Sequence, residues 1–362
     1  MKPKILVVNP HMNLFGGAER QIVELANYLT DKNYRVTIFT TYACPQFKSK
    51  LKDSRIFECG SEQNLASYCN SFSHKFDLVN PHNHPSELYF AYQLKNRIAW
   101  QANEPPGYVL EGNPINPQER EFVRRTVSKA SVITSFEFAR FRSIYGFDPV
   151  VNNPGIRYDF FAEDAPVRHN LNMKDNFVIS QLGYFTFTKN QKKTIEIFAE
   201  VKKEIPEAKL VLIGYNGNET KYPYVQSVHD KITELDLWDD VIINDYMDGD
   251  ENFRNIYKQT NVFLNPVKSQ GSYATTLEAI CAGVPTIVSD DFVASKIITD
   301  NKLGWVSSSD VEEYVNKIKY IYDNYEKCKE ETIENAKWIK ENLTWQKFGE
   351  GYERMIEEVL GN

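Results

Sequence analysis

The sequence predicts an α/β protein that contains two doubly wound parallel sheets. Short apolar runs rich in β-branched residues alternate with amphipathic helical segments, which is the pattern of βαβ units. This alternation pauses near the middle of the chain and then starts again. A chain of 362 residues is also too long for one ordinary core, and a hydrophobic share of 42% is typical of a globular protein. We therefore expect two Rossmann-like domains, over residues 1–155 and 156–344.

The first half begins with the continuous apolar run 5–8, which suits a buried parallel strand. A helix is expected next at 19–29, where apolar residues recur at helical spacing. Further strands of this half are expected at 35–40, 77–79, 98–101 and 131–134. Residues 152–176 contain two prolines, a glycine and several charges, and we interpret them as the linker between the domains.

In the second half, a strand is expected at 177–182 and a helix at 192–203. Later strands are expected at 209–214, 241–243, 262–264 and 285–288. The tail from 310 to 360 is almost all helical in pattern, and its last segment, 345–360, carries one apolar face. Because such a face has to be buried, we expect this last helix to pack against another part of the chain.

Cysteine content and charge restrict the compartment and the partners. Five cysteines without a C-x-x-C pair indicate neither a disulfide framework nor a zinc site, and free thiols in a reducing cytosol are the simplest interpretation. The run 5–8 is too short for a signal-peptide core, and no stretch approaches the roughly 18 apolar residues that span a bilayer. Residues 1–150 hold 18 basic and 14 acidic residues, whereas the rest is acidic. We therefore expect a cytoplasmic protein that does not have nucleic acid as its partner.

The sequence lacks the motifs of several common classes of enzyme. The first strand is followed by no G-x-G-x-x-G, and the chain contains neither a P-loop G-x-x-x-x-G-K-[ST] nor a G-x-S-x-G elbow. The triplet at 82–84 has two histidines, but no further histidine or cysteine nearby completes a metal site. The acidic run 245–251 lacks EF-hand spacing, and we interpret it as a solvated loop with a helix cap. No metal site is expected.

Two loops could bind phosphate. Gly16 and Gly17 lie between the first strand and its helix, where glycine lets backbone N–H groups approach a ligand and the helix N-terminus favours negative charge. A plain helix-entry turn is the alternative. In the second half, residues 183–190 also lie between a strand and a helix, and Lys189 could supply a point charge to a phosphate. A solvated lysine is the alternative there.

The most informative stretch is 261–291. An apolar strand ends at Pro266, a polar loop with a glycine leads into a short helix from about Ala274, and Gly283 ends that helix. Glu278 lies inside the helix, where a carboxylate could accept two ribose hydroxyls. A solvent-facing glutamate is the alternative, and the apolar neighbours of Glu278 argue against it.

Together these segments resemble the retaining glycosyltransferases of family 4, which have the GT-B fold of two Rossmann-like domains facing across a cleft. The resemblance covers nearly the whole chain, and its most specific part is L-E-A-I-C-A-G-V-P at 277–285. The other matching segments are G-G-A-E-R at 16–20, D-L-V-N-P-H at 77–82, W-Q-A-N-E-P-P at 100–106, N-N-P-G-I at 152–156 and T-W-Q-K-F at 344–348. The last of these looks like the start of the carboxyl-terminal helix, here 345–362, that crosses back to the first domain.

The resemblance implies roles for individual residues. Gly16 and Gly17 would lie against the donor diphosphate, with Lys189 pairing with it from the other side. Glu278 would bind the donor ribose, and His82 would lie beside the transferred sugar; His82, Lys189 and Glu278 are the implied catalytic residues. The other implied donor-binding residues are Gly183, Tyr184, Gln270, Gly271, Ser272, Tyr273, Ala274 and Thr275, and the acceptor-side residues are Arg20, Asn103 and Glu104. No metal or other cofactor is implied, because cationic side chains and helix dipoles would stabilise the leaving diphosphate.

The sequence departs from the family pattern at four of these positions. Tyr184 stands where the family usually has an arginine, so one phosphate-binding cation is lost. Gln270 replaces the first carboxylate of E-x7-E, and Asn80 replaces the first histidine of the H-x-H pair. Arg157 replaces the aspartate of P-G-[VI]-D and could restore the missing cation.

The expected function is transfer of a sugar from a UDP- or GDP-sugar to a hydroxyl of a glycan or lipid-linked acceptor, with retention of configuration. The departing phosphate would assist attack on the same face of the sugar. A non-catalytic nucleotide-sugar-binding protein of the same fold and a GT-B nucleotide-sugar epimerase are the alternatives. Segments 47–57 and 119–129 interleave basic and apolar residues and could dock on the inner face of an anionic membrane, or they could be ordinary surface helices.

Overall fold

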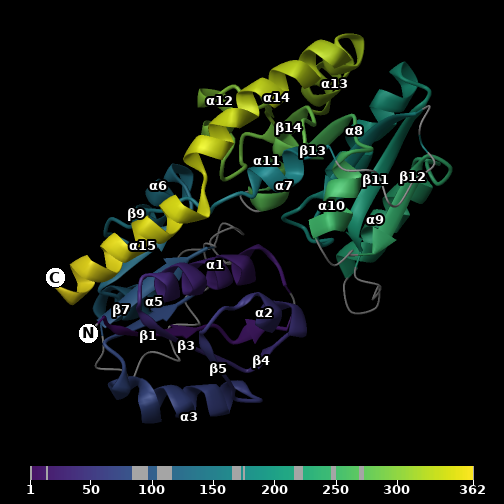
Figure 1. Cartoon of the computed structure of the whole chain (residues 1–362). Coiled ribbons are helices and arrows are strands. Elements are labelled where there is room, and N and C mark those ends of the chain that lie inside the picture. Colours follow the sequence, from purple (N-terminus) through teal and green to yellow (C-terminus); the bar gives the residue numbers. More distant parts are fainter. Residues whose placement is uncertain are drawn as a thin grey trace. The chain divides into compact units, whose positions relative to one another are not determined.

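The chain forms two units, each with its own parallel sheet (Figure 1). The computed structural model describes residues 2–13, 15–83, 97–103, 116–164, 173, 176–215, 223–245, 250–268 and 273–361. Unit 1 comprises Met1–Gly155 and Leu343–Asn362, and unit 2 comprises Ile156–Asn342. All strand pairings in the described part of the chain are parallel, so the predicted α/β fold class is confirmed.

Unit 1 contains a seven-stranded sheet in the order β5-β3-β1-β6-β7-β8-β9. Its strands are β1 (Lys4–Val8), β3 (Arg35–Thr40), β5 (Arg55–Glu58), β6 (Leu78–Pro81), β7 (Arg97–Ala102), β8 (Lys129–Val132) and β9 (Val150–Val151). A short pair, β2 (His11–Met12) with β4 (Tyr42–Ala43), lies outside this sheet. The central strand β1 is buried from Ile5 to Val8, which is why its sequence is continuously apolar. Val8 pairs with Pro81, so the carboxyl ends of β1 and β6 are level with each other.

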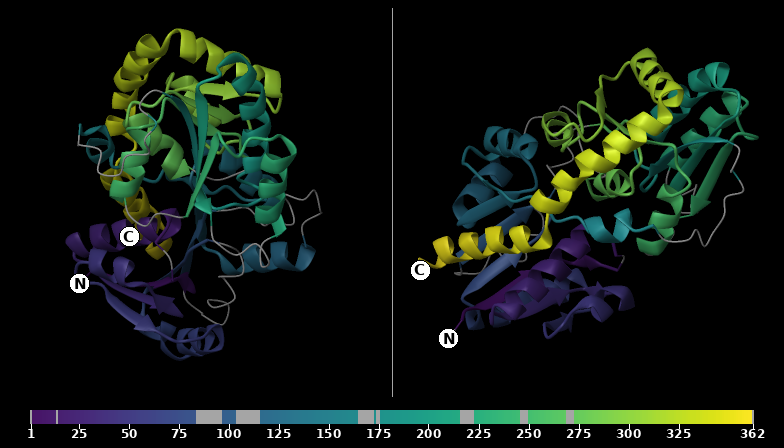
Figure 2. Two further views of the ribbon diagram at one scale, coloured as in Figure 1. Left: turned by 90° about the vertical axis from the view of Figure 1, so that its right-hand side faces the viewer. Right: turned by 45° about the horizontal axis from the view of Figure 1, so that its top comes forward.

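The last helix of the chain is part of the core of unit 1. Unit 1 also contains α1 (Gly17–Asp31), α2 (Pro45–Lys50), α3 (Glu62–Phe72), α5 (Pro117–Thr126), α6 (Ser135–Tyr145) and α15 (Trp345–Leu360). The buried face of α15, with Phe348 and Met355, packs in one apolar cluster with α1. The two helices lie side by side in the ribbon views of Figures 1 and 2. Gly349 allows this approach, because a Cβ at that position would lie 2.2 Å from the ring of Tyr28. The Asn152 side-chain amide also donates to the Phe348 carbonyl over 3.0 Å.

Unit 2 contains a six-stranded sheet in the order β12-β11-β10-β13-β14-β15. Its strands are β10 (Phe177–Leu182), β11 (Ala208–Tyr215), β12 (Val241–Asp245), β13 (Val262–Asn265), β14 (Thr286–Ser289) and β15 (Trp305–Ser307). Its helices are α7 (Tyr158–Ala162), α8 (Gln191–Glu204), α9 (Pro223–Glu234), α10 (Asp250–Tyr257), α11 (Tyr273–Cys281), α12 (Ser295–Asp300), α13 (Val311–Asp323) and α14 (Tyr325–Asn342). Buried side chains of α8, α9 and α13 share one apolar cluster with the sheet.

The interpretation of residues 152–176 as a linker is wrong for its first part. Residues 158–162 form α7, which packs on α11 in unit 2. Phe161 is fully buried, and its ring contacts the ring of Tyr257 with centroids 5.9 Å apart. The prolines and charges of the segment suggested a loop, but the Phe160-Phe161 pair supplies enough apolar surface to hold a short helix against the unit.

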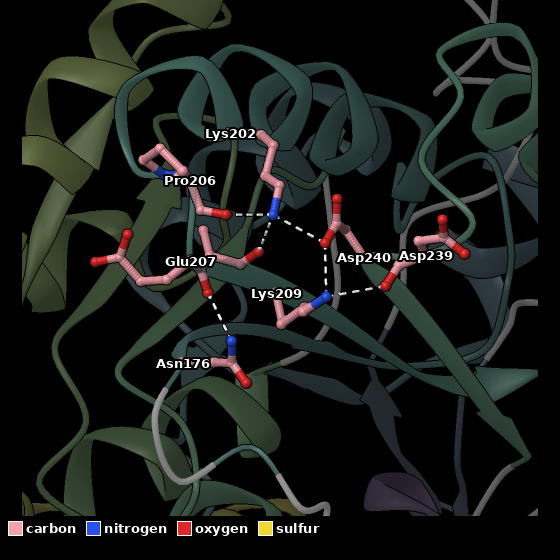
Figure 3. Close-up of polar contacts among 8 residues, drawn as sticks. Asn176, Lys202, Pro206, Glu207, Lys209, Asp239 and Asp240 are labelled. Carbon is pink, nitrogen blue, oxygen red and sulfur yellow. Dashed lines mark hydrogen bonds and ion pairs between the residues drawn. The ribbon is translucent and has the colours of Figure 1, made fainter.

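A charged cluster closes the amino-terminal edge of the sheet in unit 2 (Figure 3). Asp240, which immediately precedes β12, accepts hydrogen bonds from Lys202 Nζ at 2.8 Å and from Lys209 Nζ at 2.6 Å. Burial by itself would raise the pKa of Asp240, but the two lysine hydrogen bonds outweigh it and the pKa is lowered. In parallel α/β sheets ligands bind beyond the carboxyl ends of the strands, so this cluster serves the fold.

The basic segment 47–57 is not one amphipathic helix. α2 ends at Lys50 and β5 begins at Arg55, so the segment spans a helix end, a loop and an edge strand. Two of its bases form ion pairs within unit 1, Lys48 with Glu58 at 2.7 Å and Lys52 with Asp31 at 2.5 Å. The second segment, 119–129, does contain a surface helix, α5. None of the helices described here is both long and apolar enough to span a bilayer.

Candidate active site

The glycine turn of unit 1 caps α1. Gly16 is the N-cap residue, and its N–H donates to Glu19 Oε2 at 2.9 Å, so the carboxylate of Glu19 already satisfies this amide. Gly17 begins the helix, is exposed, and has no atom within 4 Å of where a Cβ would lie. The guanidinium of Arg20 lies over the ring of Phe15 at 5.4 Å. The turn therefore leaves open space at Gly17, with a cation one helical turn away, whereas the Gly16 amide has an internal partner.

His82 follows β6 and is fully buried. Asn80 Nδ2 donates to the Ala99 carbonyl at 2.6 Å, which leaves Asn80 Oδ1 to accept from His82 Nε2 at 2.8 Å. The proton of the ring is therefore on Nε2, and Nδ1 is a buried acceptor without a hydrogen-bond partner. Burial lowers the pKa of His82 to about 3, so the imidazole is neutral at neutral pH. Asn80, which stands where the family pattern has the first histidine of H-x-H, therefore orients the ring of His82.

The ring of His82 also stacks on Tyr352 of α15, with centroids 6.3 Å apart and planes 1° from parallel. A neutral ring held in this way can accept a hydrogen bond through Nδ1 but cannot act as an imidazolium. The place of His82 beside the transferred sugar stays a prediction.

Of the predicted acceptor-side residues, Asn103 follows β7 and is partly exposed, and Glu104 lies outside the described residues.

In unit 2 the loop after β10 is closed by two glycines. Gly183 has φ +150° and Gly214 has φ +120°, values that strongly favour glycine. A Cβ on Gly214 would lie 2.2 Å from the Gly183 carbonyl oxygen, so the ends of β10 and β11 approach each other at a spacing that excludes a side chain. Gln191 Nε2 donates to the carbonyls of Gly183 and Tyr184 at 3.2 and 3.1 Å. The loop is thus tied to the first turn of α8.

Lys189 lies at the end of this loop, one residue before the N-cap of α8. Its carbonyl accepts from Gln181 Nε2 at 2.6 Å, and Gln181 Oε1 in turn accepts from Thr194 Oγ1 at 2.6 Å. Asn190, the N-cap, has φ +59°, which asparagine tolerates better than most residues. The Lys189 side chain is partly exposed at a helix N-terminus, where a cation and a helix dipole can act on the same phosphate.

The loop that follows β13 is hydrogen-bonded to the loop between β10 and α8. The Lys268 N–H, three residues after β13, donates to the Thr188 carbonyl at 2.9 Å, and Asn190 Nδ2 donates to the Pro266 carbonyl at 3.0 Å. Lys268 Nζ lies 4.3 Å from the centre of the Phe187 ring. The structure therefore brings a second lysine to the loop of Lys189. Sequence reasoning missed Lys268, although it lies just before the polar stretch from Gln270 that the reasoning singled out.

Glu278 is 6% exposed in the middle of α11, so the solvent-facing alternative is wrong. The first turn of α11, which contains Tyr273, Ala274 and Thr275, is anchored by Tyr257, whose hydroxyl donates to the Thr275 carbonyl at 2.9 Å. Asn265, at the end of β13, donates to Thr276 Oγ1 at 2.9 Å, while its Oδ1 is buried without a hydrogen-bond partner. The predicted donor residues Gln270, Gly271 and Ser272 lie outside the described residues.

Arg157, the proposed substitute for the missing cation, packs in unit 2. Its guanidinium lies 4.3 Å from the centre of the Phe160 ring and 5.6 Å from that of Phe161. Arg254 also lies 4.3 Å from the centre of the Phe160 ring and forms an ion pair with Glu163 at 2.7 Å. The Arg157 guanidinium thus packs on aromatic rings at the start of α7, and its role as the substitute cation stays a prediction.

A comparison with known families identifies much of unit 2. Residues 162–338 match the family model described as glycosyl transferases group 1. This match defines a region of unit 2 that is similar to the group, which we call the group 1 domain, and the chain has the GT-B fold. In this group 1 domain lie the loop of Lys189, the loop of Lys268 and the buried Glu278.

Relatives and solved structures agree with this fold. The chain is 25% identical over 179 residues to alpha-monoglucosyldiacylglycerol synthase of Streptococcus pneumoniae, covering 49% of this chain and 36% of that protein. It is 27% identical over 183 residues to poly(glycerol-phosphate) alpha-glucosyltransferase of Bacillus subtilis, covering 50% of this chain and 23% of that one. The chain therefore covers about a third of the length of the Streptococcus protein and about a quarter of the length of the Bacillus protein. The structure of HepE from Anabaena in complex with UDP and glucose is similar with a TM-score of 0.82, at 15% identity over 98% of this chain and 100% of that one.

Proposed function

We propose that the protein is a retaining glucosyltransferase that moves glucose from UDP-glucose to a hydroxyl of a glycan or lipid-linked acceptor. The observation that carries this proposal is the arrangement in the group 1 domain. Two lysine-bearing loops, joined by hydrogen bonds, lie at the carboxyl ends of β10 and β13, and the buried Glu278 lies on the helix that follows. Lysine side chains suit the charge of a diphosphate, and a buried carboxylate suits the hydroxyl groups of a ribose.

The choice of sugar and stereochemistry rests on the relatives. Two of them are named for products with an alpha-glucosyl group, and HepE binds UDP and glucose. Glucose is α-linked in UDP-glucose, so an α-glucoside product means retention of configuration. We extend both the donor and the retention to this chain as parts of the proposal.

In the proposed reaction, Lys189, Lys268 and the N-terminus of α8 stabilise the charge that develops on the leaving diphosphate. Glu278 accepts hydrogen bonds from the ribose. The neutral His82 contributes a hydrogen-bond acceptor and no proton. The acceptor hydroxyl attacks on the face that the diphosphate leaves, and a departing phosphate oxygen takes its proton, so the step is balanced without a metal.

Peripheral membrane contact is proposed for unit 1. Its exposed aromatic side chains include Phe57, Tyr68 and Phe72, with exposed fractions of 49%, 40% and 37%. Lys75 Nζ lies 4.8 Å from the centre of the Phe72 ring. Exposed rings beside a base favour the interface of an anionic bilayer. Flotation with phosphatidylglycerol vesicles at low salt tests this contact, and failure to float would contradict it.

The transferase proposal is tested by incubating the full chain with UDP-glucose and a panel of acceptors. The panel holds methyl α-glucoside, dioctanoylglycerol, glycerol 1-phosphate and fructose 6-phosphate, each with and without EDTA. UDP release is measured, and NMR gives the configuration of the product. We expect an α-glucoside, with turnover reduced at least 100-fold in Glu278→Gln and Lys189→Ala.

Asp240→Asn is the matched control, because it removes a carboxylate on the amino-terminal edge of the same sheet. A β-linked product would contradict retention. A new nucleotide sugar formed without acceptor would indicate an epimerase, and tight UDP-glucose binding without turnover would indicate a non-catalytic binding protein. Turnover abolished by EDTA and restored by Mg²⁺ would contradict the metal-free step.

A further inference from the structure

Two asparagine side chains meet at the carboxyl-terminal edge of the sheet in unit 1. Asn83 follows β6 and Asn103 follows β7, both are partly exposed, and Asn103 Nδ2 donates to Asn83 Oδ1 at 2.6 Å. At the same edge, Asn9 after β1 and His82 after β6 are fully buried. Among the described residues, Asn9 Nδ2 and His82 Nδ1 have no hydrogen-bond partner. Unpartnered polar atoms are rare in folded proteins and mark this edge as a binding region.

A chain of hydrogen bonds sets the direction of the two amides. Gln101 Oε1 accepts from the hydroxyls of Tyr352 and Ser131, each at 2.5 Å. Because the oxygen of Gln101 faces these two donors, its Nε2 faces Asn103 and donates to Asn103 Oδ1 at 2.8 Å. That contact in turn points Asn103 Nδ2 at Asn83. The orientation of each amide therefore follows from the one before it, starting at Tyr352 on α15.

The backbone of Asn83 is held in the left-handed region at φ +76°. Its N–H donates to the Gln101 carbonyl at 2.8 Å, and its carbonyl accepts from Trp100 Nε1 at 3.2 Å. Since Asn83 Oδ1 is engaged by Asn103, the group that Asn83 offers to a ligand is the Nδ2 donor, which has no partner in the described part of the chain. Neutral amides of this kind suit the hydroxyl groups of a sugar and give no preference for an ion.

We propose that Asn83 and Asn103 form a subsite for the hydroxyl groups of a sugar acceptor. Asn83 Nδ2 donates to a sugar oxygen, and Asn103 accepts from a neighbouring hydroxyl through its carbonyl oxygen. Tyr352 and Gln101 are positioning residues that keep the two amides from rotating. The inference rests on the proposed transferase function and adds the chemical class of the acceptor and the residues that recognise it.

The test uses the full chain labelled with ¹⁵N-asparagine and ¹⁵N-glutamine. The side-chain amide signals of Asn83 and Asn103 are assigned as those lost in Asn83→Ala and Asn103→Ala. Methyl α-glucoside, methyl α-galactoside and methyl α-mannoside are the probes, each titrated in the presence of UDP. We expect both signals to shift with at least one probe, and Asn83→Ala to weaken its binding about threefold to tenfold, as the loss of one hydrogen bond implies.

Tyr352→Phe separates positioning from packing. It keeps the ring on His82 and removes the hydroxyl, so we expect about threefold weaker probe binding and a moved Asn103 signal, with little change in Tm. Tyr28→Phe is the matched control, because it removes a hydroxyl that bonds α1 to Glu353 of α15 at 3.0 Å but does not touch the relay. In the Asn103→Ala background, Tyr352→Phe should have no further effect on binding, because Tyr352 acts on both sugar contacts only through Gln101 and Asn103.

Three results would overturn the subsite: no probe shifts the two signals, Asn83→Ala binds the probe as well as the wild type, or the effects of Tyr352→Phe and Asn103→Ala are additive. The failure of the proposed function looks different. There, a probe would shift both signals while UDP-glucose and all acceptors gave no turnover.

Discussion

The charge state of His82 leads to a prediction that can be worked through in numbers. An ordinary histidine has a pKa of about 6.5, whereas burial lowers the pKa of His82 in the folded protein to about 3. Between pH 6.5 and pH 3, the His82 imidazole is protonated in the unfolded chain but stays neutral in the folded protein. Stability contributed by the neutral His82 is therefore complete above pH 6.5 and is lost as the pH falls toward 3. At pH 5.0 the loss amounts to about 2 kcal/mol.

The perturbation is His82→Gln, which removes the titrating group while keeping a side-chain N–H that can reach Asn80. Every other ionisable group is common to both proteins, so the difference between their unfolding free energies isolates His82. We expect the wild type to lose about 2 kcal/mol relative to the variant when the pH is lowered from 7.5 to 5.0. His11→Gln, which removes an exposed histidine of the same unit, is the control.

The assay is urea unfolding at pH 7.5, 6.5, 5.5 and 5.0, read by pulsed hydrogen exchange on peptides of unit 1. Reading these peptides measures the unfolding of this unit even when unit 2 unfolds separately. A difference between wild type and His82→Gln that stays constant with pH would refute the reasoning. It would mean that His82 accepts a proton in the folded protein and is available as an acid.

Three further predictions concern packing, the donor loops and the charged cluster. Gly349→Ala gains about 1 kcal/mol of helix propensity but places a Cβ 2.2 Å from the ring of Tyr28, so we expect a net loss of about 1–3 kcal/mol in denaturant unfolding. Gly17→Ala, at an open position, should cause no such loss, and equal stabilities would contradict the packing argument. Lys268→Ala should lower kcat/KM for UDP-glucose about tenfold without changing Tm, because a phosphate cation is lost; unchanged kinetics would remove Lys268 from the donor site. Asp240→Asn should lower the unfolding free energy of unit 2 by about 1–3 kcal/mol at pH 7. Because the folded protein lowers the pKa of Asp240, the wild type loses this advantage as the pH falls below about 4, and the two unfolding free energies should converge there. UDP-glucose turnover by that variant at 25 °C should equal that of the wild type.

The fold class could be predicted because its signals are local. The apolar run at 5–8 is β1, the six residues 177–182 form β10 and are all buried, and the apolar neighbours of Glu278 correctly indicated its burial. In each case the spacing of apolar residues within a few positions determines which face is buried. The same locality explains the error at 158–162, where prolines and charges nearby outweighed two phenylalanines whose partner, Tyr257, is about a hundred residues away.

Contacts between distant parts of the chain could not be predicted. Tyr352 and Gln101 are 251 residues apart, and neither has a local pattern that indicates a shared hydrogen bond. Lys268 and Thr188 are joined through backbone atoms, which side-chain identity does not reveal. The basic segment 47–57 has the composition of an amphipathic helix, but pairing of 55–58 with β3 makes its end a strand.

By itself, the sequence determined the two parallel α/β units, the motifs of the group 1 domain and the burial of Glu278, because periodicity and turn residues act over a few positions. Only the tertiary structure decided the state of His82. Burial and the amide of Asn80 make it a neutral acceptor, whereas its sequence position implied only a catalytic histidine. The tertiary structure also decided that the last helix orients amides at the edge of the first sheet, because hydrogen-bond direction depends on which groups the fold brings together.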